Sequence, residues 1–204
     1  MGIEDIGTLD WDKQGGLLPA VVQDARTLRV LMVGWMDRDA LAATLDGGKV
    51  TFFSRSKGRL WTKGESSGHL LELVSVQVDC DADTLLVQAV PHGPTCHLMR
   101  ASCFPEAPAS LLAELDALVE GRERERPEGS YTTRLFESGL RRIAQKVGEE
   151  GVETALAAVA QDEEALAGEA ADLVFHLLVL LRARGMGLED VLSVLRRRHR
   201  PDPG

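Results

Sequence analysis

The amino-acid pattern changes abruptly after Phe104, and this change limits what the chain can fold into. Before Phe104, short runs rich in Val and Leu alternate with segments rich in Gly, Ser and Asp, which is typical of strands and turns. The prolines of P-E-A-P-A-S then interrupt the chain, and apolar residues recur with helical period from 111 to 119. We therefore expect an α+β protein, with an N-terminal mixed β domain over residues 1–106 and a C-terminal all-α helical bundle over residues 107–204.

The first half is predicted to form a mostly antiparallel sheet with one or two short helices. One helix should begin after Asp37, a good N-cap, and end at the Gly47-Gly48 pair. Strands are expected at 17–23, 28–36, 50–53, 69–78 and 84–90. In the second half, beyond the apolar stripe that begins at Leu111, helices are expected at about 132–138, 139–160, 162–184 and 188–199, with a charged loop at 122–131.

Overall composition excludes several classes of protein. The net charge of -9 argues against general nucleic-acid binding, which needs a basic surface. The N-terminus has neither the basic nor the apolar region of a secretory signal, and the longest apolar run is interrupted by His176. We expect a cytoplasmic protein with no membrane span, in which three cysteines, an odd number, serve metal rather than disulfides.

All three cysteines, Cys80, Cys96 and Cys103, lie between Val78 and Phe104. Three thiolates can hold Zn²⁺ and leave a fourth position for water, as in catalytic zinc sites. The paired C-x-x-C spacing of structural zinc modules is absent. Cysteines are also common as small core residues, so the spacing alone leaves both interpretations open.

Three aspartates, Asp79, Asp81 and Asp83, alternate around the first cysteine. In a strand they would project from one face, with Cys80 on the other. Three like charges on one face repel unless a cation intervenes, and carboxylate oxygens favour Mg²⁺. The same D-A-D-T segment has good turn chemistry, so a solvated acidic turn is the alternative.

The segment 54–68 is rich in serine, glycine and basic residues. Guanidinium and ammonium groups make charge-assisted hydrogen bonds to phosphate, and glycine lets backbone N–H groups approach it. The candidate phosphate-binding residues are Arg55, Lys57, Arg59 and Lys63. A solvated charged hairpin is the alternative, and Trp61 either stacks on a purine or belongs to the core.

The run T-F-F-S-R-S-K-G-R-L-W-T-K-G-E-S-S-G-H, with D-C-D-A-D and G-P-T-C-H-L-M-R-A-S-C-F, strongly resembles phosphoribosyl-AMP cyclohydrolases over about a hundred residues. The resemblance implies that the three cysteines bind zinc, contributed from two subunits of a dimer. It also implies that the three aspartates bind magnesium and that the basic loop holds the phosphoribosyl groups. A zinc-activated water would then attack C6 of the adenine ring. His97 and His69 are candidates for proton transfer, with His92 weaker, although structural roles would also explain them.

Two carboxylate strips are predicted in the helical half. On the first helix three glutamates occupy one sector, and on the second an acidic strip interrupts a helix that is otherwise apolar almost all round and is expected to be buried. Facing strips would form an oxygen-rich site for Mg²⁺, whereas the first strip alone would also suit a solvated surface. The residues are Glu149, Glu150 and Glu153 on the first helix, and Glu169, Asp172 and His176 on the second.

The run G-L-R-R-I-A-Q-K-V-G-E-E-G-V-E-T resembles phosphoribosyl-ATP pyrophosphohydrolases over about 134–198. The resemblance implies attack of a metal-activated water between the α and β phosphates, with release of pyrophosphate. Arg141, Arg142 and Lys146 could contact the triphosphate, or they could simply form a solvated helix face.

Together the two resemblances imply a bifunctional enzyme of histidine biosynthesis, because the product of the second half is the substrate of the first. We expect a homodimer that acts on small phosphoribosyl nucleotides, uses Zn²⁺ and Mg²⁺, and shares zinc ligands between subunits. One alternative is a cyclohydrolase fused to a general nucleotide pyrophosphatase. Another is a metal-binding scaffold without catalytic activity.

Overall fold

The protein consists of two compact units in the computed structural model, which describes residues 2–199. The division lies between Ser110 and Leu111, compared with 106 and 107 in the sequence-based prediction. The last five residues of the predicted helical domain, 200–204, lie outside the described residues. Across residues 2–199, no helix is both long enough and apolar enough to cross a bilayer.

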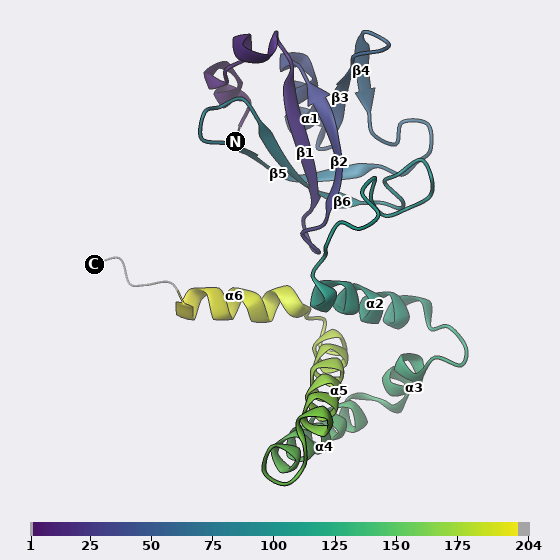
Figure 1. Ribbon diagram of the computed structural model, residues 1–204. Helices are drawn as coiled ribbons and strands as arrows, with labels where there is room; N and C mark the ends of the chain where they lie inside the picture. The colour runs from purple at the N-terminus through teal and green to yellow at the C-terminus, as the bar shows by residue number, and fades with distance from the viewer. Residues whose placement is uncertain (1, 200–204) are drawn as a thin grey trace. The chain divides into compact units, whose positions relative to one another are not determined.

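A four-stranded mixed sheet forms the centre of the N-terminal unit (Figure 1). The strand order is β2-β1-β6-β5. The β1–β2 and β5–β6 pairs are antiparallel and the central β1–β6 pair is parallel, so the predicted mixed, mostly antiparallel architecture is confirmed. The strands span Leu18–Asp24 (β1), Val30–Met36 (β2), Leu71–Val78 (β5) and Leu85–Pro91 (β6).

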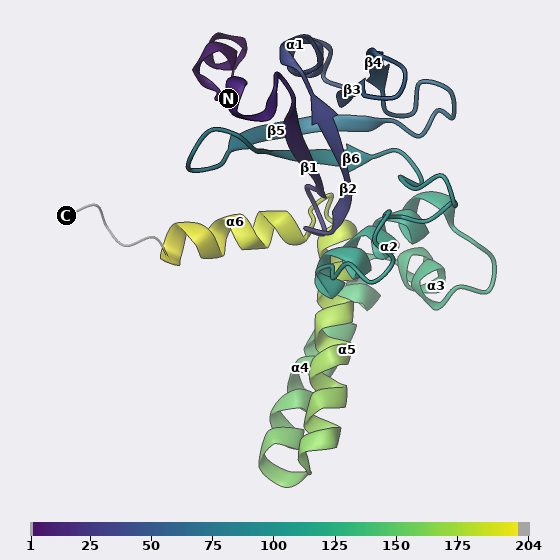
Figure 2. The same ribbon diagram turned by 45° about the horizontal axis from the view of Figure 1, so that its top comes forward.

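One face of this sheet is covered by a second layer, visible in Figure 2. The layer contains α1, the β3–β4 hairpin and a 3-10 helix, and the alternate buried residues of β1 and β6 face it. At the start of α1 the Asp37 carboxylate accepts a hydrogen bond from the Ala40 N–H at 2.7 Å, as expected for an N-cap. The elements are η1 (Ile3–Thr8), η2 (Asp12–Gln14), α1 (Arg38–Gly47), β3 (Thr51–Ser54) and β4 (Arg59–Thr62).

The core of this unit constrains Gly34 of β2. A Cβ atom at this position would lie 2.3 Å from Cδ1 of Phe52, whose ring is 1% exposed. We expect Gly34→Ala to lower the free energy of unfolding by about 2 kcal/mol, because a buried ring cannot move without repacking its neighbours. Urea denaturation measures the change. Gly47→Ala is the matched control, since its Cβ would meet nothing within 4 Å, and an equal loss in both variants would contradict the argument.

In the described part of the C-terminal unit, every regular element is a helix. The two longest helices, α4 and α5, are joined by a short turn and lie side by side (Figure 1). Ser130 and Asp162 cap α3 and α5 by accepting hydrogen bonds from backbone N–H groups. The helices span Leu111–Glu125 (α2), Tyr131–Ser138 (α3), Leu140–Ala160 (α4), Glu163–Arg182 (α5) and Leu188–His199 (α6).

One expectation for this unit was wrong, and a second is met only in part by a single chain. The charged segment predicted as a loop at 122–131 is helical up to Glu125, because Arg and Glu are good helix formers and charge alone does not end a helix. The helix predicted to be buried, α5, is only partly covered in a single chain, where Val174 and Leu177 are 38% and 39% exposed. Its main neighbour is α4, which itself exposes Val152 and Leu156.

Arg182 of α5 joins that helix to α2 through a partly buried ion-pair network. Its guanidinium donates two hydrogen bonds to Asp116, at 3.1 and 2.5 Å, and one to Glu120 at 3.1 Å. We expect Arg182→Met to lower the free energy of unfolding by about 2 kcal/mol, because Asp116 would remain buried without its partner.

Urea unfolding followed by helical circular dichroism measures this effect. Arg196→Met is the control, because Arg196 pairs with Glu189 on the exposed surface of α6 and should contribute nothing measurable. The double variant Arg182→Met/Asp116→Leu should recover part of the loss. Equal destabilisation by Arg182→Met and Arg196→Met would contradict the assigned role.

Candidate active sites

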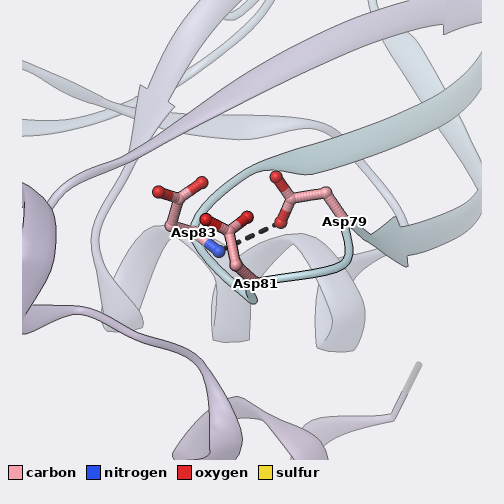
Figure 3. Close-up of side chains that lie close together, drawn as sticks. All are labelled: Asp79, Asp81 and Asp83. Carbon is pink, nitrogen blue, oxygen red and sulfur yellow. Dashed lines mark hydrogen bonds between the residues drawn. The ribbon is translucent and has the colours of Figure 1, made fainter.

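The three aspartates lie in the turn between β5 and β6 (Figure 3). The Asp79 carboxylate accepts hydrogen bonds from the N–H groups of Asp83 and Thr84, each at 3.0 Å, and Ala82 adopts a positive φ of 61°. Of the two arrangements that the sequence left open for these aspartates, the structure has the turn and not the strand. The turn aligns them instead, because β5 ends at Val78.

One oxygen from each of these carboxylates lies within 4.8 Å of the others. Lys13 of η2 places its Nζ 2.5 Å from Asp81 Oδ2 and 2.6 Å from Asp83 Oδ2. Its hydrogen bond holds the pKa of Asp83 below the usual value. The group is therefore an anionic, oxygen-only cluster, which has the chemistry to bind a hard divalent cation.

The cysteines do not meet within a single chain. Cys96 is buried, and burial together with the Cys96 thiol raises the pKa of the nearby Cys103 thiol. Cys80 lies in the acidic turn, whereas Cys96 follows the opposite end of β6, a seven-residue strand about 20 Å long at 3.3 Å per residue. The Cys103 N–H donates to Leu31 O at 2.8 Å, at the start of β2. One chain therefore places two thiols together and the third elsewhere.

Cys96 and Cys103 line a cavity of about 410 Å³ in the N-terminal unit. Its wall also contains both candidate proton-transfer histidines, and the buried hydroxyl of Thr95 there has no hydrogen-bond partner among the described residues. His92 lies outside and pairs with Glu72 at 2.8 Å. The cavity lining also includes Trp61, Lys63, His69, Thr95 and His97.

The two histidines of the cavity are held differently. The His69 ring lies against Gly93, where a Cβ would be 2.8 Å from ring atom Cδ2 and where φ is +112°. Only glycine accommodates both the close ring and this backbone conformation. His97 is exposed, and its Nδ1 is 4.0 Å from Cys96 Sγ. The cavity therefore contains one imidazole that is held in place, that of His69, and one that is accessible to solvent, that of His97.

The four basic residues predicted to bind phosphate lie at different places. Lys63 is 8% exposed, lines the cavity and donates to the His69 carbonyl at 3.4 Å, and burial lowers its pKa. Arg59 pairs with Glu65 at 2.8 Å, while Lys57 is exposed in the β3–β4 turn. This segment therefore forms a charged hairpin. Of the four basic residues, Lys63 is the one that lines the same cavity as the thiols of Cys96 and Cys103.

Arg55 belongs to a second hollow, of about 300 Å³, beside the same hairpin. Its guanidinium lies over the ring of Trp35, 4.5 Å from the centroid, with Ser54 and Ser56 nearby. Trp61 lines both hollows and stacks on Phe52 with ring centroids 5.7 Å apart. This stacking shows that Trp61 packs against the core, and the same side chain also borders the cavity.

In the helical unit, Glu150 of α4 meets Glu169 and Asp172 of α5. One oxygen from each lies within 4.8 Å of the others, and Glu150 is 4% exposed. Lys146 places its Nζ 2.5 Å from Glu150 Oε1 and lowers the pKa of that carboxyl. The acidic strips of the two helices therefore face each other across a partly buried site that is suited to a divalent cation.

The two remaining glutamates of the predicted set differ. Burial raises the pKa of Glu153, and the charges of Glu150 and Glu169 raise it further, so this side chain adjoins the cluster. Glu149 instead accepts hydrogen bonds from Arg142 at 3.1 Å and from Gln145 at 2.7 Å. Glu149 therefore lies on the rim, among basic and amide side chains.

Sequence reasoning missed Lys13 and Tyr131. The Tyr131 hydroxyl lies 3.0 Å from Nε2 of His176, whose Nδ1 is 3.7 Å from Glu150 Oε1. This contact fixes the buried imidazole beneath the acidic cluster. Neither residue could have been found by periodicity, because Lys13 lies in a 3-10 helix 68 residues before Asp81 and Tyr131 is 45 residues before His176.

Comparison with known families assigns both units. A model of the phosphoribosyl-AMP cyclohydrolase family matches residues 32–105, and a model of the phosphoribosyl-ATP pyrophosphohydrolase family matches residues 112–199. A relative from Xanthomonas axonopodis pv. citri, named histidine biosynthesis bifunctional protein HisIE, is 69% identical over 96% of this chain and 95% of its own length. The chain belongs to the HisIE family.

Other HisIE proteins match over a similar share of the chain. The Escherichia coli protein is 55% identical over 94% of this chain and 95% of its own length, and the Bacteroides thetaiotaomicron protein is 51% identical over 94% and 96%. As a member of the HisIE family, the chain is a bifunctional hydrolase. The thiol cavity and the acidic turn lie within the part matched by the cyclohydrolase family, whereas Lys13 precedes that part.

Proposed function

We propose that the chain catalyses two consecutive reactions of histidine biosynthesis in the cytoplasm. The C-terminal unit hydrolyses phosphoribosyl-ATP to phosphoribosyl-AMP and pyrophosphate. The N-terminal unit then opens the adenine ring of phosphoribosyl-AMP at the N1–C6 bond. The observation that supports this most is that each matched unit contains its own cation-competent cluster, in the β5–β6 turn of one unit and between α4 and α5 in the other, and that the first unit also contains a cavity lined by two thiols.

We assign Mg²⁺ to both acidic clusters, because their donors are carboxylate oxygens alone. Asp79, Asp81 and Asp83 would hold one ion. In the helical unit the ligands would be Glu150, Glu169 and Asp172, with Glu153 alongside. Magnesium bound there would offset the charge of the triphosphate.

We assign Zn²⁺ to the thiols, in a site completed by a second copy of the chain. Cys96 and Cys103 supply two ligands on one side of the cavity, and Cys80 of another copy would supply the third. A homodimer is also consistent with apolar side chains exposed beside this loop, such as Leu98 and Met99 at 58% and 67%.

The α4–α5 pair supports dimerisation of the helical unit as well. Its exposed apolar side chains include Val159, at 83%, on α4 and Leu177 on α5. A second copy of the pair would cover these residues and complete a four-helix arrangement. Dimerisation would therefore bury the surface of α5 that a single chain leaves exposed.

Zinc held by Cys96, Cys103 and a Cys80 from a second copy would supply a nucleophilic water near neutral pH. The cavity, at about 410 Å³, would enclose the purine and exclude bulk water. Addition of water to C6 and cleavage of the N1–C6 bond require a proton at N1, which His97 or His69 would deliver. The unpaired Thr95 hydroxyl would donate a hydrogen bond to the bound nucleotide, and Lys63 would contribute positive charge at the cavity wall.

In the pyrophosphohydrolase site the rim is basic. Arg142 and Lys146 lie beside the carboxylates and would contact the phosphates of the substrate. Attack of water between the α and β phosphates then releases pyrophosphate and leaves phosphoribosyl-AMP, the substrate of the other unit.

Turnover of phosphoribosyl-ATP by the purified full-length chain tests the proposal. We expect release of pyrophosphate followed by the ultraviolet absorbance change of ring opening. Hydrolysis of ordinary deoxynucleoside triphosphates with comparable kcat/KM would instead favour a general nucleotide pyrophosphatase fused to a cyclohydrolase. Absence of both reactions in metal-loaded protein would favour the non-catalytic scaffold.

A further inference from the structure

Lys13 is directed at the acidic turn by the backbone around it. The Asp10 N–H donates to the Ala82 carbonyl at 2.8 Å, which docks the N-terminal segment onto the turn. Trp11 is 3% exposed and its indole N–H donates to the Ile6 carbonyl at 2.9 Å, so the segment is anchored in the core. The backbone at Lys13 is therefore held beside the turn, although its side chain is itself partly exposed.

The Lys13 ammonium lies against two of the carboxylates that would hold a cation. It lies 2.5 and 2.6 Å from Oδ2 of Asp81 and of Asp83, two of the three carboxylates that converge in the turn. The third, Asp79, directs Oδ1 to backbone N–H groups. An ammonium with two carboxylate partners reduces the repulsion among three like charges.

We propose that Lys13 is a built-in counter-cation of the acidic turn, which a divalent cation must displace from Asp81 and Asp83 in order to bind. This inference rests on the proposed assignment of Mg²⁺ to the turn. An ammonium this close to the two carboxylate oxygens repels a divalent ion that coordinates them, because both groups are positively charged. Loss of Lys13 should therefore strengthen metal binding. Loss of a residue that helps to hold the metal would instead weaken binding.

Binding of Mn²⁺ to the zinc-loaded, full-length chain tests the proposal, with free Mn²⁺ measured by electron paramagnetic resonance. Glu150→Gln and Asp172→Asn are present in every sample, so that the helical site does not contribute. We expect Lys13→Met to bind Mn²⁺ about fivefold more tightly, the scale expected for losing competition from exposed ion pairs. Lys13→Arg retains a cation and should stay near the parent affinity, as should Lys49→Met, which removes a distant exposed lysine.

A thermal melt provides a second measurement. Without Mn²⁺, Lys13→Met should melt at a lower temperature than the parent protein, and saturating Mn²⁺ should remove the difference, because the bound ion replaces the missing charge.

Equal or weaker Mn²⁺ binding by Lys13→Met would overturn the role of Lys13 and leave the assignment of a metal to the turn intact. If Mn²⁺ binding at the turn is absent from the parent protein, and Asp81→Asn changes nothing, both the metal assignment and the role of Lys13 fail. The two failures are therefore distinguishable.

Discussion

Replacing Cys96 with alanine is expected to lower the rate of adenine-ring opening by about a thousandfold, while pyrophosphate release from phosphoribosyl-ATP continues. Cys96 is the buried thiol of the cavity and would be a zinc ligand next to Cys103. Removing it should leave too few ligands to retain the ion. The two domains are separate compact units, so the helical site should not be affected.

Zinc content and ring-opening rate are measured on the same protein, and pyrophosphate release serves as the internal control. Full ring opening by a zinc-free Cys96→Ala variant would contradict the zinc assignment. Co-expression of Cys80→Ala and Cys96→Ala chains tests the sharing of ligands. Because a mixed two-fold dimer would contain one intact site, mixing should restore about a quarter of the parental activity. No recovery in mixed dimers would mean that each chain supplies all of its own ligands.

Replacing Glu150 with glutamine is expected to have the reciprocal effect. Pyrophosphate release should fall by about a thousandfold, whereas ring opening of added phosphoribosyl-AMP should be unchanged. Glu150 is 4% exposed and is the contribution of α4 to the cluster that also contains Glu169 and Asp172. A neutral amide keeps the size of the side chain but removes the charge that would hold the cation.

Two comparison variants make this test specific. Glu163→Gln changes an exposed residue in the first turn of α5 and should leave both activities unchanged. Glu149→Gln should cost less than Glu150→Gln, because Glu149 is engaged by Arg142 and Gln145 on the rim. Equal losses of pyrophosphate release in the two variants would instead support the sequence-based prediction that all five carboxylates, including Glu149, hold the cation. Circular dichroism verifies that each variant remains helical.

The local pattern of the chain predicted most of the architecture. Period-two runs and turn residues predicted the β1–β2 and β5–β6 pairs, and Asp37 with Gly48 marked the ends of α1. Helical periodicity predicted α4 and α5. These features are local, because strand alternation, helix periodicity and capping each depend on residues close together in the chain.

The sequence by itself also placed the carboxylates of the two acidic clusters, since Asp79 to Asp83 are neighbours in one turn and Glu169 and Asp172 share one face of a helix. The family resemblance rests on the same short runs. Neither the sequence nor the resemblance could determine which of the other candidate side chains lie together in the fold.

The tertiary structure alone decided that Lys13 reaches the acidic turn, that Lys63 is buried beside the thiols, and that Cys80 is separated from the other cysteines by the length of β6. It also decided that one chain leaves α5 partly uncovered. Each of these depends on contacts between segments far apart in sequence. Such contacts follow from how the sheet and helices pack, and no periodic signal along the chain records them.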